Sequence, residues 1–226
     1  YSNIAIGTED AVYRLNGFNV RQLESLIQKI QSAALDIFQH SAEWRELLEV
    51  VRLYQKGEHY FSSWEWRSFS QLLLVKQRLQ ELDIDADFIA REGDNPVAQL
   101  ALKLSMDDVA ESGRNHFNEQ VIPQLVSSYQ AFFDQIESQP LSAPQRKACV
   151  TNEDHTLVVA GAGTGKTSTL IGKAGYLLKA GLAQPENILM LAFGNKAARE
   201  MAERIAERLP ESGDKLKATT FHAFGN

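Results

Sequence analysis

Residues 160–167 have the types and spacing of a loop that binds phosphate groups. They read Ala-Gly-Ala-Gly-Thr-Gly-Lys-Thr, with Ala160 where the strict pattern has glycine. Glycines allow consecutive backbone N–H groups to turn inward as an anion-binding nest, and a helix that starts at the end of the loop adds roughly half a positive charge. Lys166 would reach the β- and γ-phosphate oxygens, and the Thr167 hydroxyl would be a ligand for Mg²⁺.

The segments on either side of the loop fit this interpretation. His155–Ala160 is apolar and predicts a strand, and Lys166–Leu178 predicts a helix, which is the context that a phosphate-binding P-loop requires. A dinucleotide-binding fingerprint would need a third glycine at position 166, where lysine stands. The ligand indicated is therefore a nucleoside triphosphate. The alternative is a glycine-rich turn with an exposed lysine.

The remainder of the carboxyl-terminal region alternates strands and helices. Ile188–Phe193 predicts a buried strand, Asn195 caps a helix that runs to about Leu209, and Leu216–Thr220 predicts a further strand. This alternation is typical of a parallel sheet with right-handed crossovers. The predicted fold class is α/β: a mostly helical amino-terminal region, then from about residue 141 the first part of a P-loop (RecA-like) parallel-sheet domain.

The first 140 residues are expected to be mainly helical after an initial β-hairpin at 1–17, interpreted as the tail of a preceding domain. Trp44, Trp64 and Trp66 lie in amphipathic segments and are expected to be core residues. The expected elements are strands Asn3–Ile6 and Ala11–Leu15, a helix from an Asn19 cap to about Ile37, helices Ala42–Lys56 and Ser63–Leu82, an acidic turn-rich segment Asp83–Asp94, a helix from Pro96, and a long helical stretch Met106–Ser138.

Composition gives two conflicting indications about nucleic acid. The chain has 29 acidic and 23 basic residues, for a net charge of −6, which alone argues against a phosphate-rich partner. Divided at residue 140, however, the first part has 21 acidic and 12 basic residues (−9) and the second has 8 acidic and 11 basic (+3). The acidity therefore belongs to the helical region, and the P-loop segment remains compatible with nucleic acid.

The single cysteine and the lack of a long apolar run exclude further classes. Cys149 cannot form an internal disulfide and is expected to be a buried thiol in a reducing, cytoplasmic setting. No apolar run approaches the ~20 residues of a membrane span. We expect no membrane partner.

Three segments around the P-loop resemble helicase motifs. Leu141–Ala148 resembles the Q motif, Leu191–Met201 resembles motif Ia, and Thr219–Phe224 resembles motif Ib. In this order and at this spacing, residues 141–226 resemble the UvrD/Rep family of superfamily 1 DNA helicases. The resemblance implies an ATP-dependent enzyme that moves 3′ to 5′ on single-stranded DNA and unwinds duplex DNA, with ATP and Mg²⁺ as cofactors and protein partners left open.

The resemblance assigns a nucleotide site. An amide can donate to N7 and accept from N6 of adenine, and the resemblance gives this role to Gln145. Two departures from the family are Ser142, where Asn is frequent, and Ser168, where Arg is frequent. The candidate nucleotide-binding residues are Gln145, Gly161, Ala162, Gly163, Thr164, Gly165, Lys166, Thr167 and Ser168, with Lys166 and Thr167 as catalytic residues and Thr167 as the Mg²⁺ ligand.

The resemblance also assigns a DNA site at the carboxyl ends of two predicted strands, the edge where ligands bind in open parallel sheets. Phe193 could stack on a base and Lys196 neutralise a phosphate, whereas Gly194 lacks the hydroxyl of the family's usual threonine. His222 has the alternative of a partnered histidine at a helix start. The candidate DNA-binding residues are Phe193, Gly194, Asn195, Lys196, Thr220, Phe221 and His222.

Hydrolysis needs a carboxylate for Mg²⁺ and another that orients the attacking water. None of the acidic residues after Thr167 ends an apolar strand, and the ends of the chain suggest a fragment. We therefore expect the chain by itself to bind nucleotide weakly without turnover. Two alternatives stay open: a helicase-nuclease subunit of the same superfamily, and a protein-interaction module with a structural P-loop.

Overall fold

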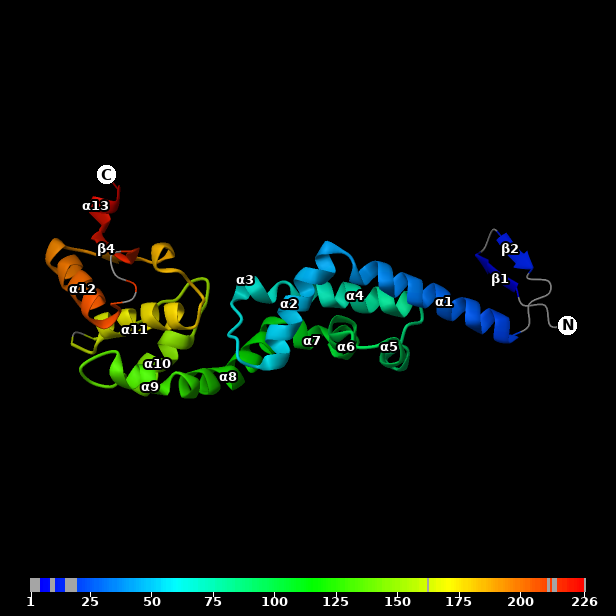
Figure 1. The fold of residues 1–226 in the computed structure, drawn as a ribbon, viewed down its shortest axis with the longest axis horizontal. Coiled ribbons are helices and arrows are strands. Elements are labelled where there is room, and N and C mark those ends of the chain that lie inside the picture. The colour runs from blue at the N-terminus through cyan, green and yellow to red at the C-terminus, as the bar shows by residue number, and fades with distance from the viewer. Residues whose placement is uncertain are drawn as a thin grey trace. The chain divides into compact units, whose positions relative to one another are not determined.

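The structure, a computed structural model, describes residues 5–8, 11–14, 20–161, 163–210, 212 and 215–225. These residues are mostly helical, with a small parallel sheet near the carboxyl terminus and an antiparallel hairpin near the amino terminus (Figure 1). No helix within the described ranges is both long and apolar enough to cross a membrane. Two compact units are present, Tyr1–Arg52 with Ser68–Met106, and Leu53–Arg67 with Asp107–Asn226. This division does not coincide with the boundary expected near residue 140.

The first unit contains the hairpin and a helical core. Strands β1 and β2 pair antiparallel from Ala5↔Arg14 to Thr8↔Ala11, so the predicted hairpin forms, although β1 is displaced along the chain from the predicted strand. Glu9 and Asp10, between the two strands, and the predicted cap Asn19 lie outside the described residues. The elements are β1 (Ala5–Thr8), β2 (Ala11–Arg14), α1 (Val20–Gln39), the larger part of α2 (Ala42–Lys56), α4 (Phe69–Glu81), α5 (Ala86–Glu92) and α6 (Pro96–Lys103).

Several predictions for the helical region are wrong in detail. The segment expected to be turn-rich at Asp83–Asp94 contains α5, because the Asp85 side chain accepts a hydrogen bond from Phe88 N at 2.7 Å and caps the helix. The helix expected over Ser63–Leu82 is divided after α3 (Ser63–Trp66), which a Ser62–Glu65 capping box begins. Trp44 and Trp66 are buried as expected, whereas Trp64 is 68% exposed.

The long helical stretch expected over Met106–Ser138 is broken twice. Ala110 adopts an extended conformation, with φ −67° and ψ 169°. The turn there is so tight that a Cβ on Gly113 would lie 2.0 Å from the Asp108 carbonyl oxygen. A second break falls at Tyr129, with φ −106° and ψ 18°. The resulting helices are α7 (Met106–Val109), α8 (Glu111–Ser128) and α9 (Gln130–Gln135).

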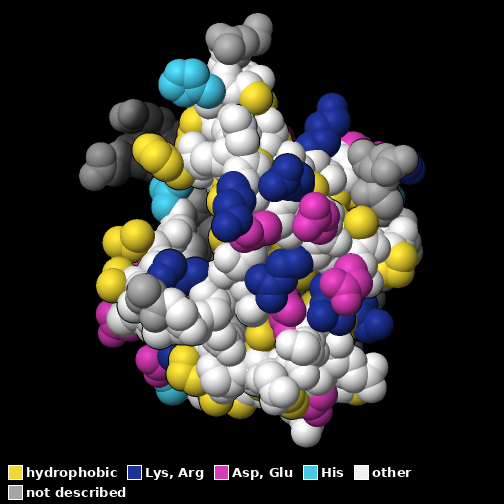
Figure 2. Space-filling view, turned by 90° about the vertical axis from the view of Figure 1, so that its left-hand side faces the viewer, with side chains coloured by type: hydrophobic (Ala, Val, Ile, Leu, Met, Phe, Trp, Pro, Cys, Tyr) yellow, Lys and Arg dark blue, Asp and Glu magenta, His cyan; other side chains and the backbone are white. Residues whose placement is uncertain are grey.

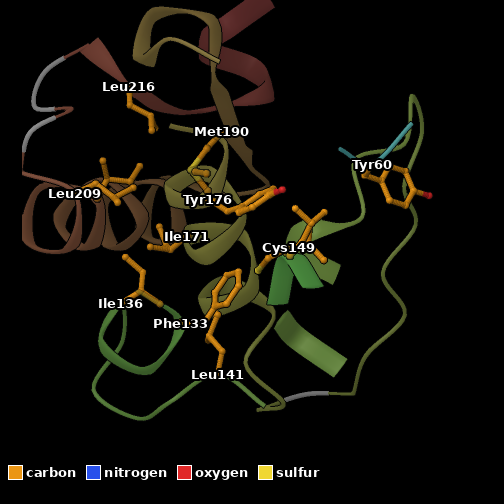
Figure 3. Packing of buried hydrophobic residues seen from close by; sticks show 14 of the residues in the cluster. Tyr60, Phe133, Ile136, Leu141, Cys149, Ile171, Tyr176, Met190, Leu209 and Leu216 are labelled. Carbon is orange, nitrogen blue, oxygen red and sulfur yellow. The ribbon is translucent and has the colours of Figure 1, made fainter. Parts of the chain in front are cut away.

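The second unit is built around α11, which begins at the end of the glycine-rich loop. Figure 3 shows buried side chains gathering around Ile171 and Tyr176 of this helix, among them Phe133, Met190 and Leu209. Besides α3, α8, α9 and most of α7, the elements of this unit are α10 (Ala143–Val150), α11 (Lys166–Lys179), a 3₁₀ turn η1 (Pro185–Asn187), β3 (Leu189–Ala192), α12 (Asn195–Arg208), β4 (Lys217–Thr220) and α13 (Phe221–Gly225).

Cys149 belongs to this core. It is fully buried, as expected, and its thiol lies 3.5 Å from the Thr169 carbonyl oxygen. Burial raises the pKa of Cys149 to about 12, although Lys173 acts in the opposite direction. The thiol is therefore un-ionised at neutral pH and acts as a packing group.

Strands β3 and β4 pair in parallel, from Leu189↔Lys217 to Ala192↔Thr220, which confirms two of the predicted strands. The third, expected at His155–Ala160, is not formed. Leu157 and Val159 are each 87% exposed. A strand needs a hydrogen-bonded neighbour, and β3 and β4 pair only with each other within the described part of the chain.

A polar network joins the two sides of residue 140. The Tyr60 hydroxyl donates to Glu153 Oε1 at 2.6 Å, Ser63 N donates to Oε2 at 3.2 Å, and Arg114 forms an ion pair with Oε1. Burial alone would raise the pKa of Glu153, but the hydrogen bonds from Tyr60, Arg114 and Ser63 outweigh it, so this pKa lies below its usual value. The carboxylate thus holds the helical region against the segment that leads into the loop.

The network predicts a pH-dependent contribution to stability. A depressed carboxyl pKa stabilises the folded state above the unfolded-state value of about 4.3 and ceases to do so as the pH falls through the folded-state pKa. We expect Glu153→Gln to lower the free energy of unfolding by about 2 kcal/mol at pH 7. The difference from the wild type should shrink below about pH 4. Urea unfolding at several pH values measures it, with the exposed Glu119→Gln as a control that should change little. An equal deficit at pH 7 and pH 3.5 would contradict this role.

Close packing of α11 gives a second prediction. A Cβ on Gly175 would lie 2.6 Å from Phe132 Cζ and 2.9 Å from Leu209 Cδ2. Gly175→Ala should therefore destabilise the protein by about 1–3 kcal/mol through overpacking, although alanine favours a helix by about 1 kcal/mol. Gly194, which has open space around its Cβ position, supplies the control Gly194→Ala. A higher unfolding midpoint for Gly175→Ala would show that this contact does not limit packing.

Candidate functional site

The glycine-rich loop has the backbone conformation that its glycines permit. Gly163 and Gly165 have φ values of +74° and +85°, in the left-handed region that side chains with a Cβ rarely adopt. Gly165 directly precedes α11, so the helix begins where the loop ends. Ala162 lies outside the described residues. The described part of the loop thus meets the N-terminus of a fourteen-residue helix, a favourable position for an anion.

Lys166 bends back over the loop. Its ammonium group donates to the Ala160 carbonyl at 3.2 Å and to the Gly161 carbonyl at 2.6 Å, and the side chain is exposed. Thr164 Oγ1 donates to the same Gly161 carbonyl at 2.8 Å. Weak backbone acceptors therefore hold the lysine, and phosphate oxygens can replace them, since charge-assisted hydrogen bonds are stronger.

The residues present fit Mg²⁺ only as an ion shared with a nucleotide. Thr167 lies in the first turn of α11 and is partly exposed. No group of three His, Cys, Asp or Glu residues in the described ranges could hold a metal ion by itself. Mg²⁺ characteristically binds through one or two protein groups together with phosphate oxygens and water. A single hydroxyl beside an anion cradle is consistent with that arrangement.

Gln145 packs directly against the loop. Its Nε2 donates to the Thr164 carbonyl at 3.2 Å, and its Oε1 accepts from Ser142 N at 2.7 Å within a capping box. A Cβ on Gly165 would lie 2.4 Å from Gln145 Nε2, so glycine is needed there for this contact as well as for its positive φ. Sequence reasoning placed Gln145 beside the nucleotide. In the structure, its amide is engaged by the loop and by its own helix start.

Ser168 is bonded to a residue that the sequence did not indicate. Arg204 Nη2 of α12 donates to Ser168 Oγ at 3.2 Å and to Glu137 Oε2 at 2.9 Å. A cation from another helix therefore stands beside the position where the resemblance implied an arginine. The separations of 36 and 67 residues explain why no local pattern could have revealed this contact.

Aromatic side chains follow the carboxyl ends of the paired strands. Ala192↔Thr220 is the last pair of the β3–β4 register, and Phe193 and Phe221 come directly after it. Phe193 is 100% exposed and Phe221 is 61% exposed. Phe224, which the candidate set omitted, is 63% exposed on α13, and its spacing of three residues from Phe221 was the signal for a shared face. Exposed rings at neighbouring strand ends could receive bases.

The other candidate DNA-binding residues differ in accessibility. Lys196 and His222 are exposed, whereas Thr220 is buried and its Oγ1 accepts from Ala223 N at 3.2 Å. Asn195 is the first residue of α12, and Gly194 occupies the N-cap position, so the predicted Asn195 cap is wrong. Thr220 therefore begins a helix and has little surface to offer a ligand.

Charges on the carboxyl-terminal face are mixed. Figure 2 shows Lys and Arg side chains interspersed with Asp and Glu side chains. Along α12, Lys196 lies 3.9 Å from Glu200 and Arg199 lies 4.0 Å from Glu203. These exposed pairs contribute little to stability. The acidic partners reduce the positive potential that the net charge of +3 for residues 141–226 suggests.

Comparison with known proteins identifies the segment that contains these residues. Residues 141–226 match the family model of the UvrD/REP helicase N-terminal domain. The matched segment includes the glycine-rich loop, α11, the parallel strand pair and α12.

Curated relatives extend this result. The chain is 50% identical to DNA helicase IV of Escherichia coli over 113 residues, which are half of this chain and 16% of that protein. It is 43% identical over 83 residues to a probable DNA helicase II homolog of Rickettsia conorii, and 39% identical over 83 residues to the ATP-dependent DNA helicase PcrA of Staphylococcus aureus. Each of the latter matches covers 37% of this chain, and 12% and 11% of the respective relatives.

The chain thus spans a small fraction of each relative's length. The helicase IV match is longer than residues 141–226, so it also includes part of the helical region that precedes the Q motif. The resemblance to the UvrD/Rep helicase family is confirmed, and residues 141–226 are the part of the chain that carries it.

Proposed function

We propose that the chain forms part of an ATP-dependent DNA helicase that moves 3′ to 5′ on single-stranded DNA and resembles DNA helicase IV. The observation that carries the proposal is one compact unit that contains both a glycine-rich loop at the start of α11 and exposed aromatic rings at the ends of two parallel strands. The family match over residues 141–226 supports it.

In this proposal, the loop binds the phosphates of ATP. Backbone N–H groups of the loop and the α11 N-terminus cradle the anion, Lys166 exchanges its two carbonyl partners for phosphate oxygens, and Thr167 completes the coordination of Mg²⁺. Gln145 reads adenine only after its amide leaves the Thr164 carbonyl. Base recognition therefore involves a local rearrangement of the loop.

DNA binds at the strand ends. Phe193 and Phe221 offer ring faces on which any base can stack, and Lys196 offers a charge to a phosphate. Binding through base stacking and phosphate charge does not depend on the base sequence. An enzyme that moves along DNA requires such sequence-independent binding. Thr220 acts indirectly, since it caps the helix that presents Phe221 and Phe224.

The chain by itself is proposed to bind ATP without hydrolysing it. Hydrolysis requires a carboxylate that orients the attacking water, and no acidic residue after Thr167 ends an apolar strand. The acidic residues of α12 are committed to that helix's exposed face, with Glu200 and Glu203 next to Lys196 and Arg199. The loop therefore acts in binding within this chain.

Removal of the loop lysine tests the nucleotide site. Lys166→Ala should weaken binding of a fluorescent ATP analogue in Mg²⁺ by at least about tenfold, because a charge-assisted bond contributes about 1.5–3 kcal/mol. Lys179→Ala removes the same charge about 20 Å away at the other end of α11 and should leave the affinity unchanged. Unchanged affinity in Lys166→Ala would favour a structural P-loop in an interaction module. ATP hydrolysis by the chain that Lys166→Ala abolishes would contradict the proposed lack of turnover.

Removal of an exposed ring tests the DNA site. Phe193→Ala should weaken binding of a fluorescent oligo(dT) by about tenfold at fixed salt, because stacking of one base contributes about 1–3 kcal/mol. Fluorescence anisotropy measures the affinity. Trp64→Ala, which removes a ring that is 68% exposed on α3, serves as the control and should have no effect. Equal affinities for wild type and Phe193→Ala would place the DNA contact elsewhere.

A further inference from the structure

Arg204 connects three parts of the carboxyl-terminal unit. It lies in α12, the helix that begins directly after Phe193 and Gly194. Its guanidinium donates to Ser168 Oγ, one residue beyond Thr167, and to Glu137, in the bend that follows α9. One side chain therefore joins the helix behind the strand ends to the first turn after the glycine-rich loop.

Glu137 anchors this arginine. Its side chain is 4% exposed, and Arg204 lies 2.9 Å from its Oε2. Removing the cation beside a buried carboxylate is strongly destabilising if nothing replaces it. Arg204 therefore stays near Glu137 unless another cation takes its place.

A second arginine is positioned to take that place. Arg208, one turn along α12, has its Nε 3.8 Å from Glu137 Oε2. Glu137 Oε1 and Arg208 Nε are both buried, and neither has a hydrogen-bond partner among the described residues. A small shift of α12 can thus give Glu137 a hydrogen bond from Arg208 as Arg204 departs. With Arg208 at this distance, the buried carboxylate keeps a cation beside it when Arg204 departs.

We propose that Arg204 is a positioning residue that couples the DNA-binding strand ends to the nucleotide loop by engaging or releasing Ser168. The inference rests on the proposed function and deepens it. DNA that contacts Phe193 and Lys196 acts on the first turn of α12, and the same helix carries Arg204 to Ser168. Bound ATP acts on the other partner, because Ser168 directly follows the residue proposed to hold Mg²⁺.

Coupling of this kind is reciprocal and can be measured. If DNA changes the affinity for ATP by some factor, ATP changes the affinity for DNA by the same factor, typically 5–150-fold. Arg204 is suited to this role because its Nη2 donates to both Glu137 and Ser168 within a planar guanidinium whose donor directions are fixed, whereas a lysine ammonium sits on a flexible stem. The arginine therefore matters for the coupling, whereas neither ligand needs to contact it.

The experiment compares affinities for a fluorescent ATP analogue in Mg²⁺ with and without saturating oligo(dT). In the wild-type chain we expect a ratio of at least about fivefold. Arg204→Ala and Arg204→Lys should bring the ratio close to one, while the affinity for each ligand alone changes by less than about twofold. Ser168→Ala keeps the Glu137–Arg204 pair, and should also bring the ratio close to one. The double variant Ser168→Ala/Arg204→Ala should lose nothing further, because the two residues act through one contact.

Arg199→Ala is the matched control. Arg199 lies on the same helix, is 74% exposed, and its one ion pair is with Glu203 at 4.0 Å in the described part of the chain. Its removal should leave the ratio at the wild-type value. A ratio that survives in both Arg204→Ala and Ser168→Ala would overturn the inference, as would a wild-type chain that binds both ligands without coupling. A wild-type chain that binds no ATP analogue contradicts the proposed function itself, and the inference with it.

Discussion

Close packing around α11 is the constraint on which the carboxyl-terminal unit depends. Gly172 and Gly175 lie one turn apart on this helix, and side chains of the neighbouring segments occupy the space where their Cβ atoms would be. Leu141 and Cys149 fill the first space, and Phe132 and Leu209 fill the second. These residues come from segments that precede and follow α11 in the sequence. The contacts that bury α11 therefore also fix the position of the glycine-rich loop that leads into it.

Buried polar groups then join the helical region to the loop segment. The Glu153 carboxylate accepts a hydrogen bond from the Tyr60 hydroxyl and forms an ion pair with Arg114, and Glu137 forms an ion pair with Arg204. Asn118 adds a pair of hydrogen bonds to the backbone of Phe61, at 3.0 Å and 2.8 Å. Such groups require their partners, since an unpaired buried charge is costly. Residues 53–67 and 107–140 are consequently part of the structure that supports the loop, although their sequence reads as a separate extension.

The sequence predicted the features that depend on local chemistry. Helices α2 and α11 and the strand pair β3 and β4 form as expected, because their capping, periodicity and apolar runs lie within each segment. The sequence-based predictions failed where the conformation depends on residues that are far apart in the sequence or on backbone turns. His155–Ala160 is not a strand, since strand formation depends on a neighbouring strand. The breaks at Ala110 and Tyr129 follow from tight turns, and the Arg204–Ser168 contact joins residues 36 positions apart.

The exposed segment before the loop has a consequence for self-association. Leu157 and Val159 are each 87% exposed, and the intervening Val158 is 45% exposed. The segment is apolar and β-branched, and no charged residue follows His155 before the loop. An exposed stretch with this composition, which pairs with no strand in the described part of the chain, is a template on which an identical chain can add a strand. The backbone that leads into the glycine-rich loop is therefore also a place where two copies of the chain can join edge to edge.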